Sequence, residues 1–126
     1  MNIYAIGAAV LLGAGVLVHV FAAGRTLHAD MQAALVGFPK ALESVTWHAV
    51  SLWLVLHFAL ALAAVYYTHP MLNGAVAFGA VHAALLGIMC LGMSLYLCKS
   101  WIAMRQAYLF ILIAGALAGA AMTSIA

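Results

Sequence analysis

The chain has 126 residues, of which 70% are hydrophobic and only 5% are charged, and its mean hydropathy is +1.24. A soluble globular domain carries about 25% charged residues, so this composition excludes a soluble protein and indicates an integral membrane protein. The formal net charge of +2 is too small to indicate nucleic acid binding. At about 20 residues per membrane-spanning helix, the chain holds four spans and little else. We therefore predict a single membrane domain over residues 1–126.

Four long apolar runs predict membrane spans over about residues 3–23, 45–67, 75–98 and 107–125. The expected fold is all-α: a polytopic membrane protein whose four transmembrane helices form an up-down-up-down bundle. In the connection 24–44, apolar residues recur at helical spacing among polar ones. This pattern indicates a short amphipathic helix lying in the membrane interface, and the alternative is an irregular loop.

The basic residues predict the orientation of the chain in the membrane. All four Lys and Arg residues fall in the first and third connections, 24–44 and 99–106: Arg25, Lys40, Lys99 and Arg105. Short loops rich in Lys and Arg stay in the cytoplasm. Both connections are therefore expected to be cytoplasmic. The protein is expected in a bacterial inner membrane, as a multi-pass protein with periplasmic N- and C-termini.

Small residues recur on three of the predicted spans, where they let helix backbones approach closely in lipid. They are Ala8, Gly15 and Ala22 in the first span, Ala75, Gly79, Ala83 and Gly87 in the third, and Gly115 and Gly119 in the fourth. These faces are expected to pack helix against helix.

Six histidines are the main chemical anomaly of so apolar a chain, because ionisable residues within a membrane mark candidate functional sites. Four of them fall within the predicted spans. With a rise of about 1.5 Å per residue, His19 and His48 lie about 10–12 Å to the cytoplasmic side of the midplane, and His57 and His82 lie within about 6 Å of it. Each layer draws on two antiparallel helices, as bis-histidine ligation of haem b requires.

The angular spacing of His48 and His57 limits this arrangement. The two are nine residues apart, so on an α-helix they point to opposite sides. A helix of a four-helix bundle has one inward side, which disfavours two stacked haems. We predict that His19 and His48 face each other inside the bundle and that His57 lies at the bundle edge or at an oligomer contact.

A second hypothesis is a transition-metal site at the cytoplasmic layer, since imidazole and carboxylate ligands suit zinc, copper and iron. Its candidate ligands are His19, His28, Asp30, Glu43 and His48. The spacing matches no established ligand motif. The alternative is that the only two acids, Asp30 and Glu43, pair locally with Arg25 and Lys40.

The third span adds a group of sulfur ligands. Met89, Cys90 and Met93 lie close together on one side of it and have the softness that suits cuprous copper. The alternative is that the methionines only fill gaps between helices.

The sequence thus predicts a small membrane protein that binds a haem or a transition metal through intramembrane histidines, in a redox or electron-transfer role. The alternatives are an accessory subunit or assembly factor of a larger membrane complex, and an oligomeric ion or metal transporter. The expected surroundings are the lipid bilayer, with a homo-oligomer or a larger complex as the assembly. No Ser, His and acid set stands at a spacing typical of nucleophilic catalysis, so the sequence leaves open whether the protein is an enzyme.

Overall fold

The computed structural model describes residues 2–123, and its regular elements are all helices. They are α1 (Ile3–Val16), the π-helix η1 (Leu17–His28), α2 (Ala29–Ala34), α3 (Gly37–Tyr66), α4 (Pro70–Cys98) and α5 (Gln106–Thr123). The first three run on as one helix, so four helices of the described chain are long and apolar enough to cross a membrane. The predicted all-α fold with four membrane-spanning helices is confirmed. Residues 124 and 125 of the predicted last span lie outside the described residues.

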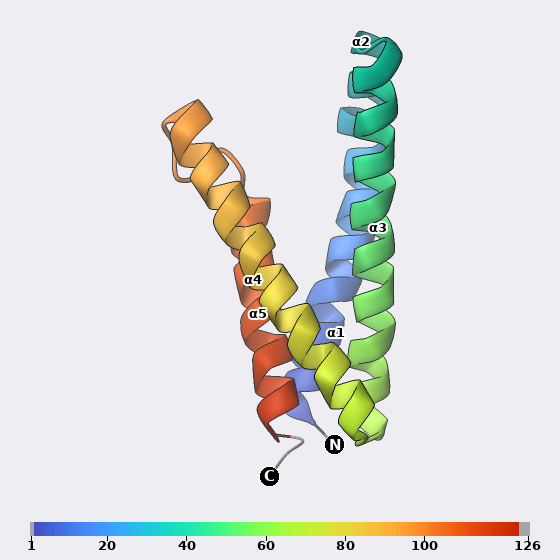
Figure 1. The fold of residues 1–126 in the computed structure, drawn as a ribbon, viewed down its shortest axis with the longest axis vertical. Coiled ribbons are helices and arrows are strands. Elements are labelled where there is room, and N and C mark those ends of the chain that lie inside the picture. The colour runs from blue at the N-terminus through green and yellow to red at the C-terminus, as the bar shows by residue number, and fades with distance from the viewer. Residues whose placement is uncertain (1, 124–126) are drawn as a thin grey trace.

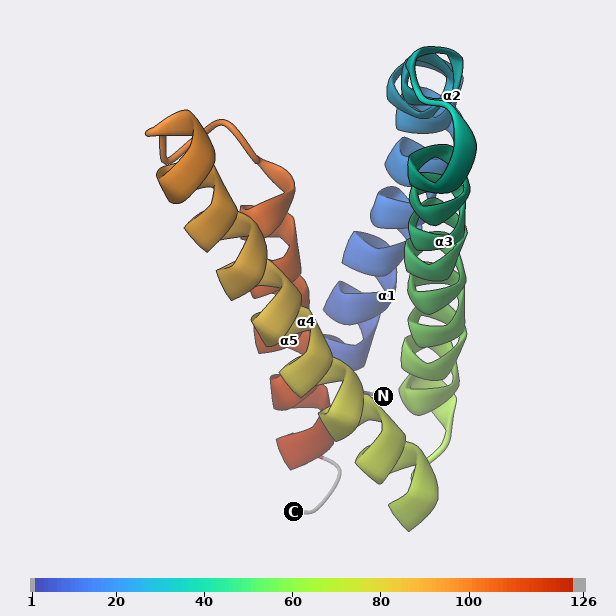
Figure 2. The same cartoon turned by 45° about the horizontal axis from the view of Figure 1, so that its top comes forward.

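The helices form two hairpins that meet at one end only. Figures 1 and 2 show the α1–η1–α2/α3 hairpin and the α4/α5 hairpin converging near the chain termini and separating toward the connections 35–36 and 99–105. α1 packs on both α3 and α5, and α3 also contacts α4. In contrast, no Cα atom of η1 or α2 lies within 8 Å of one in α4 or α5. The bundle is therefore closed at the terminal end and open at the other.

The connection 24–44 differs from its prediction. It is helical, but it forms no separate helix: its first part continues the first long helix to Ala34, and α3 begins at Gly37. Only Leu35 and Val36 are extended, and Gly37 has a φ of 61°, a left-handed conformation that glycine adopts without steric cost. The sharp reversal lets η1 and α2 pack on α3. The helical spacing of apolar residues in this segment therefore belongs to two helices that pack on each other as a hairpin.

The start of α1 is tied to the other hairpin by Asn2. Its Oδ1 accepts hydrogen bonds from the backbone N–H groups of Tyr4 and Ala5 at 3.1 and 3.2 Å, which caps the helix. Its Nδ2 donates to the carbonyl of Ala120 in α5 at 3.0 Å. One side chain therefore both begins α1 and fixes it against α5.

The core lies where α1, α3, α4 and α5 converge. Its largest fully buried apolar side chains are Leu12, Val76, Ile113 and Leu117. The predicted packing faces are confirmed for most of the small residues of α4 and α1, because Gly79, Ala83, Gly87, Ala8 and Gly15 are buried. Ala22 is exposed because it belongs to η1, which packs on α3 alone among the other three spans.

The end of α4 carries a strained residue that offers a test of the fold. Lys99 has φ 52° and ψ 31°, which costs a residue with a Cβ roughly 1 kcal/mol. We expect Lys99→Gly to be more stable than Lys99→Ala by about 1 kcal/mol, as measured by thermal unfolding in detergent. Both variants lose the ammonium group that lies 5.4 Å from the Tyr96 ring, so the comparison isolates the backbone. Equal stabilities would contradict this conformation of Lys99.

Candidate functional site

The π-helical segment η1 sets the direction of two histidines. His19 and His28 are nine residues apart, which on an α-helix would place them on opposite sides. The i→i+5 hydrogen bonding of a π-helix turns the chain by only roughly 80° per residue, so nine residues complete about two turns. Both histidines therefore lie on the same side of η1, facing α3. The two were predicted in one candidate metal site, but α-helical geometry would not have placed them on a common side.

Trp47 of α3 joins these two histidines. The His19 ring stacks on it with centroids 4.1 Å apart and an interplanar angle of 17°, and the His28 ring stacks with values of 4.7 Å and 18°. Because the histidines are two helical turns apart, their rings approach the indole from opposite sides. His19 Nε2 also donates to the Trp47 carbonyl at 3.3 Å. Trp47 was not among the predicted site residues, although it stands next to His48 in the sequence.

The strongest polar contact of this region is between His28 and Glu43. His28 Nδ1 donates to Glu43 Oε1 at 2.9 Å. Gln32 Nε2 donates to the second carboxylate oxygen and, at 3.2 Å, to the carbonyl of Lys40. The His48 ring meets the His28 ring edge-on, with centroids 5.9 Å apart. The open end of the first hairpin thus gathers two imidazoles and one carboxylate, with His19 on the far side of Trp47.

Asp30, the other predicted carboxylate ligand, does not lie with His28, His48 and Glu43. Asp30 is exposed and forms no ion pair with any described residue. Neither acid pairs with Arg25 or Lys40 within residues 2–123, so the alternative of local acid–base pairing is wrong for both. The carboxylate of Glu43 pairs with a histidine because η1 presents that ring across the hairpin.

The predicted roles of His48 and His57 are reversed. The two point to opposite sides of α3, as expected, but His48 is exposed and His57 has only 4% of its surface exposed. α4 packs beside the C-terminal half of α3, so the side of α3 that carries His57 becomes the inward side there. The half that carries His48 has only the first long helix beside it. The prediction that His48 faces the interior and His57 the edge was therefore wrong.

His57 lies in a close contact between α3 and α4. Its Nδ1 donates to the Trp53 carbonyl at 2.9 Å, and its ring stacks on the Trp53 indole at 4.4 Å. On the other side is Gly79, where a Cβ would come within 2.3 Å of His57 Cδ2. The absence of a side chain at Gly79 therefore makes room for the imidazole.

His82 of α4 meets the same indole edge-on. The Trp53 and His82 centroids are 5.4 Å apart at 71°, and Phe110 and Phe78 add edge-on contacts to Trp53 and His82. His57 and His82 thus lie at one level, as the depth argument predicted, with Trp53 in contact with both. Trp53 was not among the predicted site residues. Its position in the middle of a span is a usable signal, because tryptophans of membrane proteins gather at the two membrane interfaces.

The predicted sulfur group lies on the surface of α4. Met89 and Met93 have 53% and 43% of their surface exposed, and Cys90 is half-buried. Over residues 2–123 as they stand, no three or more His, Cys, Asp or Glu side chains are close enough together to hold a metal ion. A complete metal centre is therefore not assembled in this conformation.

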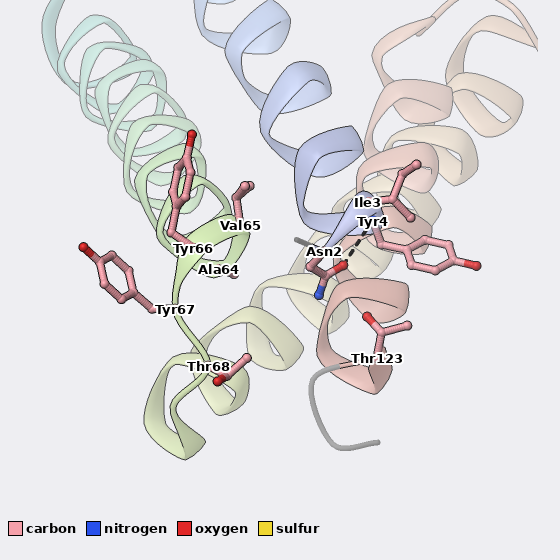
Figure 3. A pocket seen from close by; sticks show the side chains of 9 residues that line it. All are labelled: Asn2, Ile3, Tyr4, Ala64, Val65, Tyr66, Tyr67, Thr68 and Thr123. Carbon is pink, nitrogen blue, oxygen red and sulfur yellow. Dashed lines mark hydrogen bonds between the residues drawn. The ribbon is translucent and has the colours of Figure 1, made fainter.

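A hollow of about 350 Å³ lies at the closed end of the bundle (Figure 3). It is lined by Asn2, Ile3, Tyr4, Ala64, Val65, Tyr66, Tyr67, Thr68 and Thr123. Asn2 is engaged in capping α1, the Thr123 hydroxyl donates to the Gly119 carbonyl at 2.8 Å, and Tyr67 points away from Asn2. The hollow therefore gathers no convergent chemical groups of the kind found in ligand sites.

Comparison of the chain with protein-family models, with curated proteins and with solved structures gives no match. The function must therefore be inferred from the geometry.

Proposed function

We propose that the protein binds a transition-metal ion through the imidazoles of His28 and His48, at the open end of the first hairpin, in a redox or metal-handling role. The observation that carries this proposal is the 2.9 Å hydrogen bond from His28 Nδ1 to Glu43 beside the His48 ring. A metal-ligating histidine typically donates its second ring N–H to a carboxylate. Glu43 would thus fix His28 with Nε2 available as a ligand.

Completion of the site requires a movement of His48. Its side chain is exposed, and exposed side chains change rotamer within nanoseconds. Two imidazoles per chain suit copper, zinc or iron, with the other positions taken by water or by the same two histidines of a second copy. The distribution of positive charge agrees with access from the cytoplasm, because Arg25 lies in η1, Lys40 lies at the start of α3, and Lys99 and Arg105 lie in the connection 99–105.

Elemental analysis and an optical spectrum of protein purified from membranes test the proposal. We expect one bound metal ion per chain or per two chains, and binding that is lost in His28→Ala. Glu43→Gln should weaken binding by about 10–100-fold, because it removes the group that orients His28. The control is His69→Ala, which should leave binding unchanged. His69 caps the start of α4, just beyond the end of α3 that lies farthest from His28.

Two results would contradict this assignment. The first is a metal-free protein that also fails to bind added Co2+ or Cu+. The second is a Soret band that survives His28→Ala but disappears in His57→Ala or His82→Ala, which would place a haem at the midplane layer instead.

A second candidate function, an accessory subunit of a larger membrane complex, is favoured by the open half of the first hairpin. η1 contains no buried residue, and Leu17, Val18 and Phe21 are each more than half exposed. In this reading a partner helix fills the space between the hairpins. Light scattering after extraction in mild detergent tests it, and a population that is monomeric at every detergent concentration would contradict it.

A further inference from the structure

The indole N–H of Trp53 is buried and lacks a hydrogen-bond acceptor. It is the one buried side-chain polar atom within residues 2–123 that has no partner. Buried polar groups are paired in the great majority of cases, and an unpaired one calls for an explanation such as a ligand. Trp53 lies near the middle of α3, Gly37–Tyr66, where the surrounding bilayer offers no water to satisfy it.

The neighbouring residues cannot supply this acceptor. His57 packs on one face of the indole, and its Nδ1 is already used by the Trp53 carbonyl. Phe110 contributes only ring edges or faces. His82 approaches edge-on, and no described residue forms a hydrogen bond with its imidazole. The seam between α3 and α4 therefore presents an unused indole donor beside an unused imidazole.

The seam borders the lipid-facing side of α4, although the indole N–H itself is buried. His82 is partly exposed, and next to it Phe78 and Val81 have 67% and 59% of their surface exposed. A ligand in the bilayer can lay a flat ring against the Phe78 and His82 rings, and it reaches the indole N–H when the His82 side chain turns aside. At the middle of the span it must be lipophilic, and it must carry an oxygen that accepts a hydrogen bond. Phospholipid ester groups have this oxygen, but they lie outside the hydrocarbon core, about 15 Å from its centre.

We propose that Trp53 and His82 form a lateral binding site for a quinone, which accepts a hydrogen bond from Trp53 Nε1–H through one carbonyl oxygen and keeps its tail in the bilayer. His82 contacts the quinone ring or a second oxygen through its imidazole. The site shares no residue with the proposed metal site, so the two proposals fail independently.

Indole NMR tests the site at the atom concerned. The chain has three tryptophans, and Trp47→Phe and Trp101→Phe assign the ¹⁵N–¹H indole signals without altering Trp53. We expect a short-tailed benzoquinone to shift the Trp53 Nε1–H signal downfield and saturably, with little effect on Trp101. In His82→Leu the affinity should fall at least tenfold. His69→Leu, at the remote end of α4, is the matched control and should keep the wild-type affinity.

Two further titrations distinguish the source of the acceptor. An alkylbenzene of the same size, which lacks carbonyl groups, should leave the Trp53 signal unshifted. A diacyl phospholipid added in detergent should also leave it unshifted. The quinone assignment is overturned if either compound reproduces the shift, or if the quinone produces none up to its solubility limit.

Discussion

Replacement of Gly79 by alanine is expected to destabilise the protein by about 1–3 kcal/mol. A Cβ at this position would come 2.3 Å from His57 Cδ2 and 2.9 Å from its Nε2. The imidazole cannot move aside freely, because Trp53 stacks on it and its Nδ1 is bound to the Trp53 carbonyl. α4 must therefore shift away from α3. Equilibrium unfolding in mixed micelles would measure the loss.

Gly92→Ala on the same helix is the matched control. No atom lies within 4 Å of a Cβ built at Gly92, so the substitution should be neutral or stabilise by up to about 1 kcal/mol through helix propensity. If Gly79→Ala proved as stable as Gly92→Ala, the contact between His57 and α4 would be wrong. The inward position of His57 would then also be wrong.

Removal of the Ser94 hydroxyl is expected to destabilise the protein by about 1–3 kcal/mol, because two partly buried backbone groups then lose their partner. Ser94 is fully buried in α4. Its Oγ donates to the Ser100 carbonyl at 2.6 Å and accepts from the Met104 N–H at 3.2 Å. One hydroxyl therefore holds both sides of the 99–105 connection. Ser94→Ala should unfold at lower denaturant, and proteolysis should cut this connection first.

Ser51→Ala controls for the loss of a hydroxyl within a helix. The Ser51 Oγ donates only to the Trp47 carbonyl, four residues earlier in α3, at 3.0 Å. Loss of such a local bond leaves no orphaned group in the connection, and stability should change by less than about 0.5 kcal/mol. Similar losses in Ser51→Ala and Ser94→Ala would show that the connection does not depend on Ser94.

The transmembrane architecture could be predicted from the sequence, because apolar runs and their interruptions are local signals. The position of the hairpin at Gly37 was harder to predict from the sequence. Its position depends on which short segment reverses the chain, and helical spacing on both sides of the reversal suited an interfacial helix equally well. The opening between the hairpins has no local signal at all, because it arises from where α1 and α5 stop touching.

The histidine site was predictable in depth but not in direction. His57 and His82 meet at one level, since depth follows from the rise along each helix. The pairing of His28 with Glu43 depends on the π-helical geometry of η1. A π-helix changes the angular spacing of side chains around the helix axis, and no sequence pattern predicts where one forms. The inward position of His57 depends on Gly79, a residue of another helix, so no pattern within α3 reveals it.

The length of the first hairpin determines from which phase its polar end is reached. α3 contains 30 residues, about 45 Å of helix, whereas the hydrocarbon core of a bilayer is about 30 Å thick. The excess of about 15 Å, nearly three turns, lies at the end that carries Lys40 and Glu43, because the opposite end is apolar and ends at Tyr66. We infer that this end stands in the headgroup layer and the adjoining water. Ions and protons therefore exchange with His28 from bulk solution, without crossing the hydrocarbon core of the bilayer.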